Sequence, residues 1–446
     1  MIVINPSTEE RRELEETPLI EIGSAVTRAR TQQRVWAEFP LKKRIETIEQ
    51  LAPLLEEKRE ILAETIVLDM GKPFKRALRE VDASIDAITF NCRQATAWLS
   101  NEVLDAGYVC FDPLGVVAVI APWNFPVITS IHPIIPALLS GNAVIYKPSE
   151  LSLFTGKLLG ELISNLEGLP KGLFETVIGG KEHGKTLVES PIDMVAFTGS
   201  TQAGKDIMRR GADKMKRMLL ELGGMDAAIV LKDADIEKSA ADIVRANCNN
   251  SGQVCCSIKR VYVESSVYKD FLKAAVKESE RILIGDPTSN VDMGPLVAHF
   301  QLEKIERIVE DAKKKGALIH TGGKRLSQPG YFYPSTVISN VSADMSLLTE
   351  EPFGPLLPIM EVSDWQEAVT LSNESPYGLT GSVWTSNLEL GESIARKLEV
   401  GVASLNSHGP GPMGAPWGGA KQSGLGRLKC KEGMRSFTNE KFVKTA

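Results

Sequence analysis

A chain of 446 residues exceeds the size that one hydrophobic core usually serves, so its length predicts two domains, with three as the upper limit. Its 43% apolar and 24% charged residues are close to the globular average, which excludes a disordered, collagen-like or coiled-coil protein. The net charge of -6 lacks the positive excess that a nucleic-acid-binding surface requires, so the expected partner is a small molecule.

The N-terminal residues, the apolar stretches and the cysteines do not suggest export, membrane insertion or a metal centre. Residues 1–30 contain no basic start followed by an apolar core, so we expect a cytoplasmic protein without a secretory signal. The most apolar stretch, 126–145, is interrupted by Pro133, Pro136 and several polar residues, which predicts a buried helix and no membrane span. The 6 cysteines are too sparse for a disulfide framework and form no C-x-x-C pair, so we expect reduced thiols and no metal site.

The first half of the chain predicts helices followed by an alternating pattern. Residues 22–37 and 41–101 have helical spacing of apolar residues. Short apolar runs then alternate with helical stretches, the runs at 115–120, 143–146, 175–178 and 194–197 and the helices at 127–140, 150–166 and 203–216. This alternation predicts a parallel sheet with helices on both faces.

The same rhythm restarts after Gly223-Gly224. Strands are expected at 227–231 and 260–264 and helices at 235–250 and 267–283, with further alternation between 356 and 405. A second α/β domain therefore begins near residue 224, and the turn-rich segment 101–114 predicts a hairpin between elements. The expected fold class is α/β, with two doubly wound, Rossmann-like domains and a small hairpin.

A reactive thiol is the first candidate for chemistry. Gly252-Gln-Val-Cys255 follows a helical stretch and a turn-like run that begins at Asn249, which could expose the thiol of Cys255. A cysteine attacks as the thiolate, so catalysis would need a lowered pKa or a nearby base. A buried core cysteine is the alternative, because free cysteines are usually buried.

Two polar residues stand where strands are expected to end. Glu221 follows the strand-like run 218–220, where α/β proteins form ligand crevices, and a buried carboxyl there would suit proton transfer near neutral pH. Asn124 follows the strand 115–120, and its side-chain amide could donate to a developing oxyanion. Taken alone, each residue could equally be a turn residue.

Two glycine-containing segments could bind phosphate. Phe197-Thr-Gly-Ser-Thr-Gln-Ala-Gly204 links a strand to a helix and would suit a dinucleotide pyrophosphate, although it lacks the G-x-G-x-x-G spacing and could be a plain turn. The run from Gly179 to Thr186 formally matches the G-x-x-x-x-G-K-[ST] loop of NTPases. No convincing downstream strand supplies a magnesium-binding Asp, so we expect a chance match on a strand-to-turn segment.

The order and spacing of the motifs resemble the aldehyde dehydrogenase superfamily over essentially the whole chain. The resemblance depends on Asn5-Pro-Ser-Thr8, Pro122-Trp-Asn-Phe-Pro126, Lys147-Pro-Ser-Glu150, Phe197-Thr-Gly-Ser-Thr201, Glu221-Leu-Gly-Gly224, Gly252-Gln-Val-Cys255, Glu350-Glu-Pro-Phe-Gly-Pro355, Tyr377-Gly-Leu379 and Pro416-Trp-Gly-Gly419 with Lys421 and Ser423-Gly424.

The resemblance implies a role for each catalytic candidate. Cys255 looks like the nucleophile, with Cys256 as a bystander, and Asn124 looks like the oxyanion-hole amide. Glu221 looks like the base that activates water to hydrolyse a Cys255 thioester. The implied reaction oxidises an aldehyde to a carboxylic acid without a metal.

The resemblance also implies NAD as cofactor, with NADP possible. Glu150 would repel a 2′-phosphate, which favours NAD. Lys147 and Glu150 resemble residues that hold the adenosine ribose, and Glu351 and Phe353 resemble those that position the nicotinamide ribose and ring. The full set of expected cofactor-binding residues is Trp123, Lys147, Ser149, Glu150, Gly199, Ser200, Gly204, Glu351 and Phe353.

The substrate is less well defined. The run 131–135 resembles the class 3 branch of the superfamily, Pro133 replaces a frequent lysine, and His132 stands where succinate-semialdehyde enzymes often have an arginine. We therefore expect an apolar aliphatic or aromatic aldehyde, with a semialdehyde as the alternative. A thioesterase or an acyltransferase on the same fold is the alternative of a different class.

The resemblance divides the chain into three parts. Residues 1–100 and 115–223 would form the NAD-binding domain, 224–425 the catalytic domain, and 101–114 with 436–446 the elements that bridge subunits. A homodimer or homotetramer is therefore expected.

Overall fold

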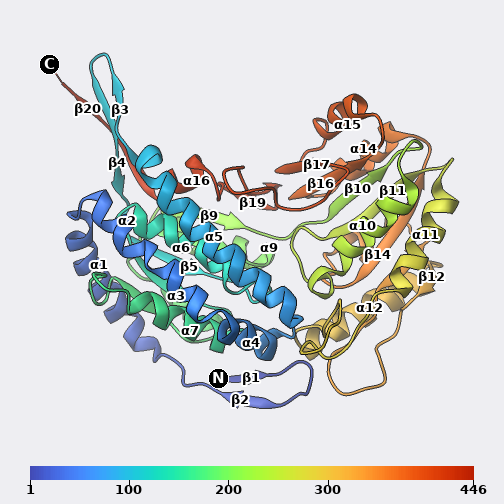
Figure 1. Cartoon of the computed structure of the whole chain (residues 1–446), viewed down its shortest axis with the longest axis horizontal. Helices are drawn as coiled ribbons and strands as arrows, with labels where there is room; N and C mark the ends of the chain where they lie inside the picture. Colours follow the sequence, from blue (N-terminus) through green and yellow to red (C-terminus); the bar gives the residue numbers. More distant parts are fainter. Residues whose placement is uncertain (446) are drawn as a thin grey trace.

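The computed structural model describes residues 1–445 and divides them into two lobes, each built around a parallel sheet (Figure 1). The one predicted residue outside this range is 446, the last of the expected bridging segment 436–446. Among the described residues, none of the helices combines the length and apolar character needed to cross a lipid bilayer.

The first lobe contains a six-stranded sheet. Its strands, in spatial order, are β19 (Gly424–Leu425), β9 (Arg217–Glu221), β8 (Met194–Thr198), β5 (Val116–Ile120), β6 (Ala143–Lys147) and β7 (Phe174–Thr176). All neighbouring pairs are parallel except β19 with β9. Within this sheet the chain forms β5 first, adds β6 and β7 on one side, and then adds β8 and β9 on the other. This order creates a topological switch point between β5 and β8.

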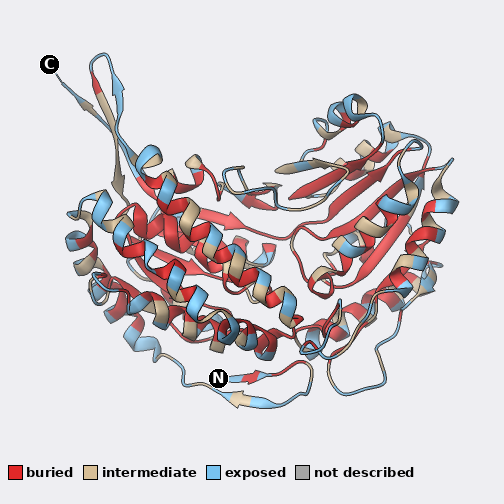
Figure 2. Ribbon diagram, viewed as in Figure 1, coloured by how far each residue is buried: buried red, intermediate tan, exposed pale blue. Residues whose placement is uncertain are grey.

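Helices cover this sheet on both sides, as the alternating pattern predicted. They are α1 (Leu19–Ala37), α2 (Leu41–Glu49), α3 (Leu51–Glu57), α4 (Arg59–Met70), α5 (Phe74–Leu99), α6 (Ile128–Leu139), α7 (Leu153–Ser164), α8 (Lys181–Glu189) and α9 (Thr201–Ala212). The strands β5 and β6 are buried along their whole length, since they lie between two helical layers (Figure 2). The largest apolar core of the protein packs around them.

The second lobe contains a seven-stranded sheet wound in the same way. Its spatial order is β12 (Leu318–Thr321), β13 (Thr336–Ser339), β14 (Leu356–Val362), β11 (Ile258–Glu264), β10 (Asp226–Val230), β16 (Thr380–Trp384) and β17 (Val402–Leu405). Only β12 runs antiparallel to its neighbour. The associated helices are α10 (Ile236–Cys248), α11 (Tyr268–Glu280), α12 (His299–Lys314), α13 (Ser346–Thr349), α14 (Trp365–Asn373) and α15 (Leu388–Ala395).

The predicted elements are confirmed, with two differences. The helix expected at 203–216 ends at Ala212, because β9 begins at Arg217. The expected strand-to-turn segment around Gly179 is wrong: α8 begins at Lys181 and buries His183, Leu187 and Val188 on one face. His183 and Leu187 are four positions apart, which is the spacing of a helix face.

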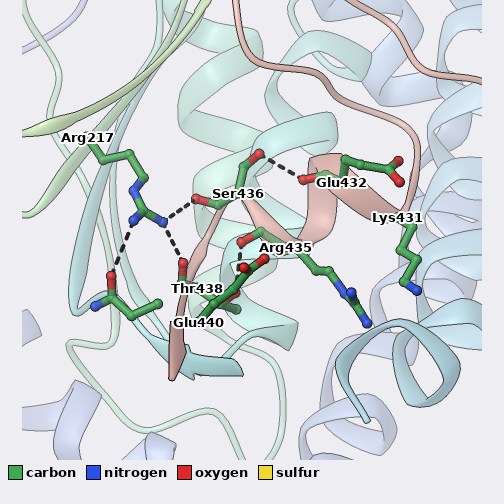
Figure 3. A pocket seen from close by; sticks show the side chains of 8 residues that line it. Arg217, Lys431, Glu432, Arg435, Ser436, Thr438 and Glu440 are labelled. Carbon is green, nitrogen blue, oxygen red and sulfur yellow. Dashed lines mark hydrogen bonds between the residues drawn. The ribbon is translucent and has the colours of Figure 1, made fainter. Parts of the chain in front are cut away.

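The hairpin expected at 101–114 is confirmed and projects from the first lobe (Figure 1). Strands β3 (Glu102–Leu104) and β4 (Gly107–Pro113) form its arms, and the C-terminal β20 (Thr438–Lys444) pairs with β4. At its base is a cavity of about 480 Å³, where Arg217 donates to the carbonyl of Thr438 at 2.5 Å (Figure 3). The smaller elements are β1 (Ile2–Ile4), β2 (Arg11–Glu13), β15 (Tyr377–Gly378), β18 (Ala420–Lys421) and α16 (Lys431–Arg435).

Asn142 joins three parts of the first lobe and provides a test of its packing. Its side chain is fully buried, accepts from the N–H of Gly115 at 2.9 Å, and donates to the carbonyls of Ala137 at 3.0 Å and Phe437 at 2.9 Å. We predict that Asn142→Ala lowers the free energy of unfolding by about 2–4 kcal/mol, because it leaves buried backbone groups without partners. Urea denaturation measures the change, and Asn101→Ala, at an exposed position, is the control. Equal midpoints for the two variants would contradict this role.

Candidate functional site

The candidate active site is a cavity of about 410 Å³ that is lined from both lobes. Cys255 and Glu221, both predicted from the sequence, line it together. Glu221 is the last residue of β9 in the first lobe, whereas Cys255 precedes β11 in the second. Ligand crevices of α/β proteins form at the carboxyl ends of strands, where Glu221 lies. The apolar part of the wall includes Phe125, Ile128, Val254, Trp417 and Leu428.

Cys255 is held by a turn with unusual backbone angles. In the short helix η1 (Asn249–Gly252), Asn250, Ser251 and Gly252 have φ values of 50°, 57° and 75°. Two non-glycine residues in the left-handed region carry a conformational cost that the surroundings must offset. At Gly252 a Cβ would lie 2.2 Å from the carbonyl carbon of Gly354, so no larger residue fits.

Hydrogen bonds from the side chains of this turn to neighbouring segments hold it in place. The side chain of Asn250 donates to the carbonyl of Asn124 at 3.0 Å, and Ser251 donates to the carbonyl of Gly294 at 2.8 Å. Gln253 accepts from the N–H of Val297 at 2.8 Å. The turn leaves Cys255 partly exposed, while the neighbouring Cys256 is buried.

The surroundings of Cys255 and Glu221 raise the pKa of both groups. A hydrogen bond with Cys256 and desolvation raise the pKa of Cys255 well above its ordinary value, and Lys259 acts in the opposite direction. Burial, followed by the charge of Cys255, raises the pKa of Glu221 well above its ordinary value. Within residues 1–445 neither carboxylate oxygen of Glu221 has a hydrogen-bond partner. A buried carboxylate in this state can take up a proton near neutral pH.

Asn124 lies beside the turn that carries Cys255, residues 249–255, here called the nucleophile turn. It belongs to the loop between β5 and α6, and its Nδ2 donates to the carbonyl of Gln253 at 2.9 Å. The amide is buried against the turn that carries Cys255 and is not itself part of the cavity lining. A side-chain amide in this place has a second N–H with which to stabilise negative charge on oxygen.

A buried ion pair that was not predicted from the sequence supports the Asn124 loop. Lys72 and Glu80 form a salt bridge with both side chains 1% exposed. Lys72 also donates to the carbonyl of Asn124 at 2.8 Å, and Glu80 accepts from the N–H of Val127 at 2.9 Å. Lys72 lies in the turn between α4 and α5, and Glu80 lies in α5. Nothing local marks them as a pair, so only the tertiary contact identifies them.

A second cleft, of about 640 Å³, lies at the switch point of the first sheet. Six of the residues predicted to bind the cofactor line it, namely Trp123, Lys147, Ser149, Glu150, Gly199 and Ser200. Ser200 caps the N-terminus of α9, where its Oγ accepts from the N–H of Ala203 at 3.3 Å. The N-terminus of a helix presents N–H groups and a positive dipole, so this end of the cleft suits a phosphate.

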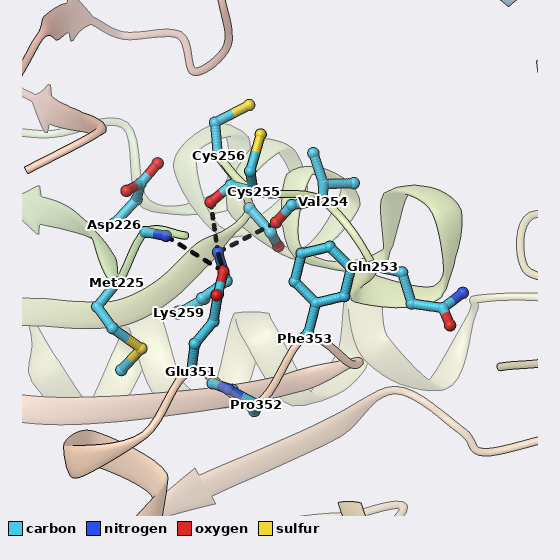
Figure 4. Close-up of polar contacts among 12 residues, drawn as sticks. Met225, Asp226, Gln253, Val254, Cys255, Cys256, Lys259, Glu351, Pro352 and Phe353 are labelled. Atoms are coloured by element: carbon cyan, nitrogen blue, oxygen red, sulfur yellow. Dashed lines mark hydrogen bonds and ion pairs between the residues drawn. The ribbon is translucent and has the colours of Figure 1, made fainter. Parts of the chain in front are cut away.

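The remaining three predicted residues lie outside that lining. A Cβ on Gly204 would come 2.6 Å from Leu222, so Gly204 packs α9 against the chain after β9. Phe353 has its ring centroid 5.5 Å from that of Trp123, edge to face, and Glu351 lies beside Gly224. Phe353 and Glu351 therefore approach from the second lobe, at the side nearer to Cys255 (Figure 4).

Helix α8 lines this cleft with Lys181, Gly184 and Lys185, within the segment that formally matches the NTPase loop. Most of the segment thus lies beside this cleft as a helix and not as a phosphate-cradling loop. Among residues 1–445 no group of three or more His, Cys, Asp or Glu side chains is arranged to hold a metal ion.

The part of the active-site cavity near α6 combines a neutral histidine with cations. Residues 131–135 lie within α6, and burial, with Lys429 nearby, lowers the pKa of His132 to about 3. His132 is therefore uncharged at physiological pH. Arg76 and Arg79 also line the cavity, and within the described chain neither guanidinium forms a salt bridge.

Known proteins match this chain over nearly its full length. A family described as "Aldehyde dehydrogenase family" matches residues 1–443. The chain is 37% identical to a 4,4'-diapolycopene aldehyde oxidase from Methylomonas sp, over 94% of this chain and 80% of the relative. It is 33% identical to a probable NADP(+) succinate-semialdehyde dehydrogenase from Sinorhizobium fredii, over 99% of this chain and 92% of the relative.

A solved structure shows the same fold. The betaine aldehyde dehydrogenase of Staphylococcus aureus, in a mutant form in complex with NAD+, superposes with a TM-score of 0.96 and 30% sequence identity, covering 100% of this chain and 94% of that one.

The buried pair Lys72–Glu80 generates a prediction about stability. Removing one partner leaves the other charge buried and alone, so we expect Lys72→Met to lower the free energy of unfolding by about 3–5 kcal/mol. The double variant K72M/E80Q should recover part of the loss, since Gln keeps an acceptor for Val127 without the charge. Urea denaturation of the wild type, both single variants and the double variant measures the coupling. Additive losses would show that the pair is not coupled.

Proposed function

Since the chain belongs to the aldehyde dehydrogenase family, we propose that Cys255, Glu221 and Asn124 carry out its oxidation of an aldehyde to a carboxylic acid. One observation carries this assignment. The thiol of Cys255 and the unpartnered, buried carboxylate of Glu221 line the same cavity, and the amide of Asn124 is bonded to the turn that bears the thiol.

In the proposed reaction the thiolate of Cys255 attacks the aldehyde carbon, and the carbonyl oxygen becomes an oxyanion. The amide of Asn124 and the N–H of Cys255 stabilise this charge. Collapse of the adduct expels the aldehyde hydrogen with its electron pair and leaves a thioester on Cys255. Glu221 then takes a proton from water, the resulting hydroxide attacks the thioester carbon, and the acid leaves as the thiolate re-forms.

We propose NAD as the cofactor, which supplies the acceptor for the hydride when it is bound. The residues of the cleft fit a dinucleotide: Lys147 is buried with its ammonium 3.8 Å from Glu150, and the N-terminus of α9 is open to a pyrophosphate. Trp123, Ser149, Gly199 and Ser200 would complete the first-lobe contacts, with Glu351 and Phe353 on the other side. Glu150 disfavours a 2′-phosphate, so NADP is the secondary cofactor.

For the substrate we propose an uncharged, apolar aliphatic or aromatic aldehyde. The apolar wall and the neutral His132 support this choice. Arg76 and Arg79 favour a second candidate, a semialdehyde whose distal carboxylate would pair with them. The relatives act on aldehydes of different charge by their names, so they favour neither candidate.

We also propose the division into an NAD-binding domain, 1–100 with 115–223, and a catalytic domain, 224–425, in a cytoplasmic homodimer or homotetramer. The two sheets support the division, although β19 returns to the first sheet. The segments 101–114 and 436–446 would bridge the subunits. Val103, Leu104 and Phe442 support this assignment, since their apolar side chains are exposed there.

The nucleophile is tested by substitution of each adjacent thiol. We predict that Cys255→Ala abolishes aldehyde-dependent NADH formation, whereas the matched Cys256→Ala keeps the reaction within about tenfold, because only Cys255 forms the thioester. Absorbance at the NADH band measures both variants. NADH formation by Cys255→Ala at a rate near the wild type would refute the assignment, and thioester hydrolysis by the wild type without NADH formation would favour the thioesterase alternative.

The base is tested in the pre-steady state. We predict that Glu221→Gln keeps a burst of NADH of about one equivalent per site but slows the steady-state rate by about 10²-fold or more, because water attack on the thioester loses its base. Since the pKa of Glu221 is raised, the steady-state rate of the wild type should fall as pH drops through that raised value. Stopped-flow absorbance distinguishes the two phases. Loss of the burst would place Glu221 in an earlier step.

The substrate class is tested with a panel of aldehydes and both cofactors. If the substrate is apolar, hexanal and benzaldehyde should give kcat/KM at least tenfold above succinic semialdehyde, and the double variant R76M/R79M should leave that preference unchanged. If the ranking is reversed and R76M/R79M selectively raises KM for succinic semialdehyde, the semialdehyde candidate replaces the first.

A further inference from the structure

Lys259 is a buried lysine directly behind the nucleophile turn. It is the second residue of β11, four positions after Cys255, and its side chain is 1% exposed. A buried ammonium group is costly unless it is paired and hydrogen-bonded. Lys259 meets this requirement in full, because its three N–H groups have three acceptors: the carbonyls of Val254 at 3.0 Å and Cys255 at 2.5 Å, and Oε1 of Glu351 at 3.1 Å (Figure 4).

The acceptors belong to two parts of the proposed site. Val254 and Cys255 belong to the nucleophile turn, and Glu351 comes from the segment before β14. Oε1 of Glu351 also accepts from the N–H of Gly224 at 3.2 Å. A Cβ on Gly223 would lie 2.3 Å from Oε2 of the same carboxylate, so only glycine admits it there. Lys259 and the two glycines thus fix the Glu351 carboxylate beside the chain that follows Glu221.

Charged and titratable groups face Lys259 from several elements. Asp226 on β10, Glu351 and Cys255 contribute negative charge, whereas Lys304 on α12 contributes positive charge, and the partly buried imidazole of His408 lies after β17. Burial lowers the pKa of Lys259, but the anions outweigh it, so its pKa lies above its ordinary value. The group is therefore a permanent cation beneath the turn, and in Figure 4 both thiols point away from it.

We propose that Lys259 is a positioning residue that fixes the nucleophile turn and the Glu351 carboxylate relative to each other, and that its positive charge favours the thiolate of Cys255. The inference deepens the proposed function and rests on it, since it gives Cys255 and Glu351 their roles. A neutral side chain of equal volume fills the same space, but it neither binds the two carbonyls and the carboxylate nor lowers the energy of a nearby thiolate.

The thiolate can be measured without aldehyde or cofactor. Alkylation of Cys255 by iodoacetamide, followed by mass spectrometry over a range of pH, reports the thiolate fraction. We expect Lys259→Met to be alkylated about tenfold more slowly than the wild type below the thiol pKa, which corresponds to a shift of about one pKa unit. Lys259→Arg, which keeps the charge, should return to within about threefold of the wild type.

Lys304→Met is the matched control, because Lys304 donates to the main-chain carbonyl of Glu351 at 2.5 Å and not to its carboxylate. Its alkylation profile should follow that of the wild type. Superimposable profiles of Lys259→Met and the wild type would overturn the proposal. If Lys259→Met fails to fold, Lys259→Gln takes its place, and equal profiles for Lys259→Gln and Lys259→Arg would overturn it equally.

Steady-state kinetics test the part that concerns Glu351. Lys259→Met should lower kcat and raise KM for NAD, each by about fivefold or more, with partial rescue by Lys259→Arg. An unchanged KM for NAD would remove Glu351 from the proposal. If the wild type forms no NADH with any aldehyde, the proposed function fails, while the alkylation profiles still decide the effect of Lys259 on the thiol.

Discussion

The hydrogen bond from the side chain of Asn124 to the carbonyl of Gln253 joins the two lobes at the point where the reaction would occur. Asn124 comes from the loop after β5, and Gln253 lies two residues before Cys255, so neither lobe contains the site by itself. Asn250 returns a second bond to the carbonyl of Asn124, and Lys72 donates to that same carbonyl. The relative position of thiol and amide therefore depends on this small set of contacts.

Around the site, some buried charged groups form ion pairs, whereas the carboxylate of Glu221 does not within the described chain. Lys72 with Glu80 and Lys259 with Glu351 are paired, and their ammonium groups also donate to main-chain carbonyls. Glu221 has no such partner within the described chain. The paired groups fix the loops, whereas the unpartnered carboxyl is left able to exchange a proton. The contrast separates groups that hold the site from the group that would change protonation during turnover.

The cofactor cleft and the thiol meet where aromatic rings of the two lobes touch. Trp123 follows β5 and lines the cleft at the switch point, Phe353 precedes β14, and the two rings are in edge-to-face contact. Phe353 itself has a φ of 56°, a conformation that costs energy in a residue with a side chain. The backbone is thus constrained on both sides of the junction, at Phe353 and at the nucleophile turn.

The sequence by itself determined the α/β class, most of the strands and helices, and the identity of Cys255, Glu221 and Asn124 as candidates. Apolar periodicity and strand-end position are local properties, and the order of the motifs supplied the rest. It did not reveal α8, because the residues at the start of this helix were interpreted as a formal match to a phosphate-binding loop. It also did not reveal the pairing of Lys72, Glu80 or Lys259, since a single lysine or glutamate carries no local sign of its distant partner. Only the tertiary structure decided that these charges are buried and paired, because pairing depends on residues that are far apart in the chain.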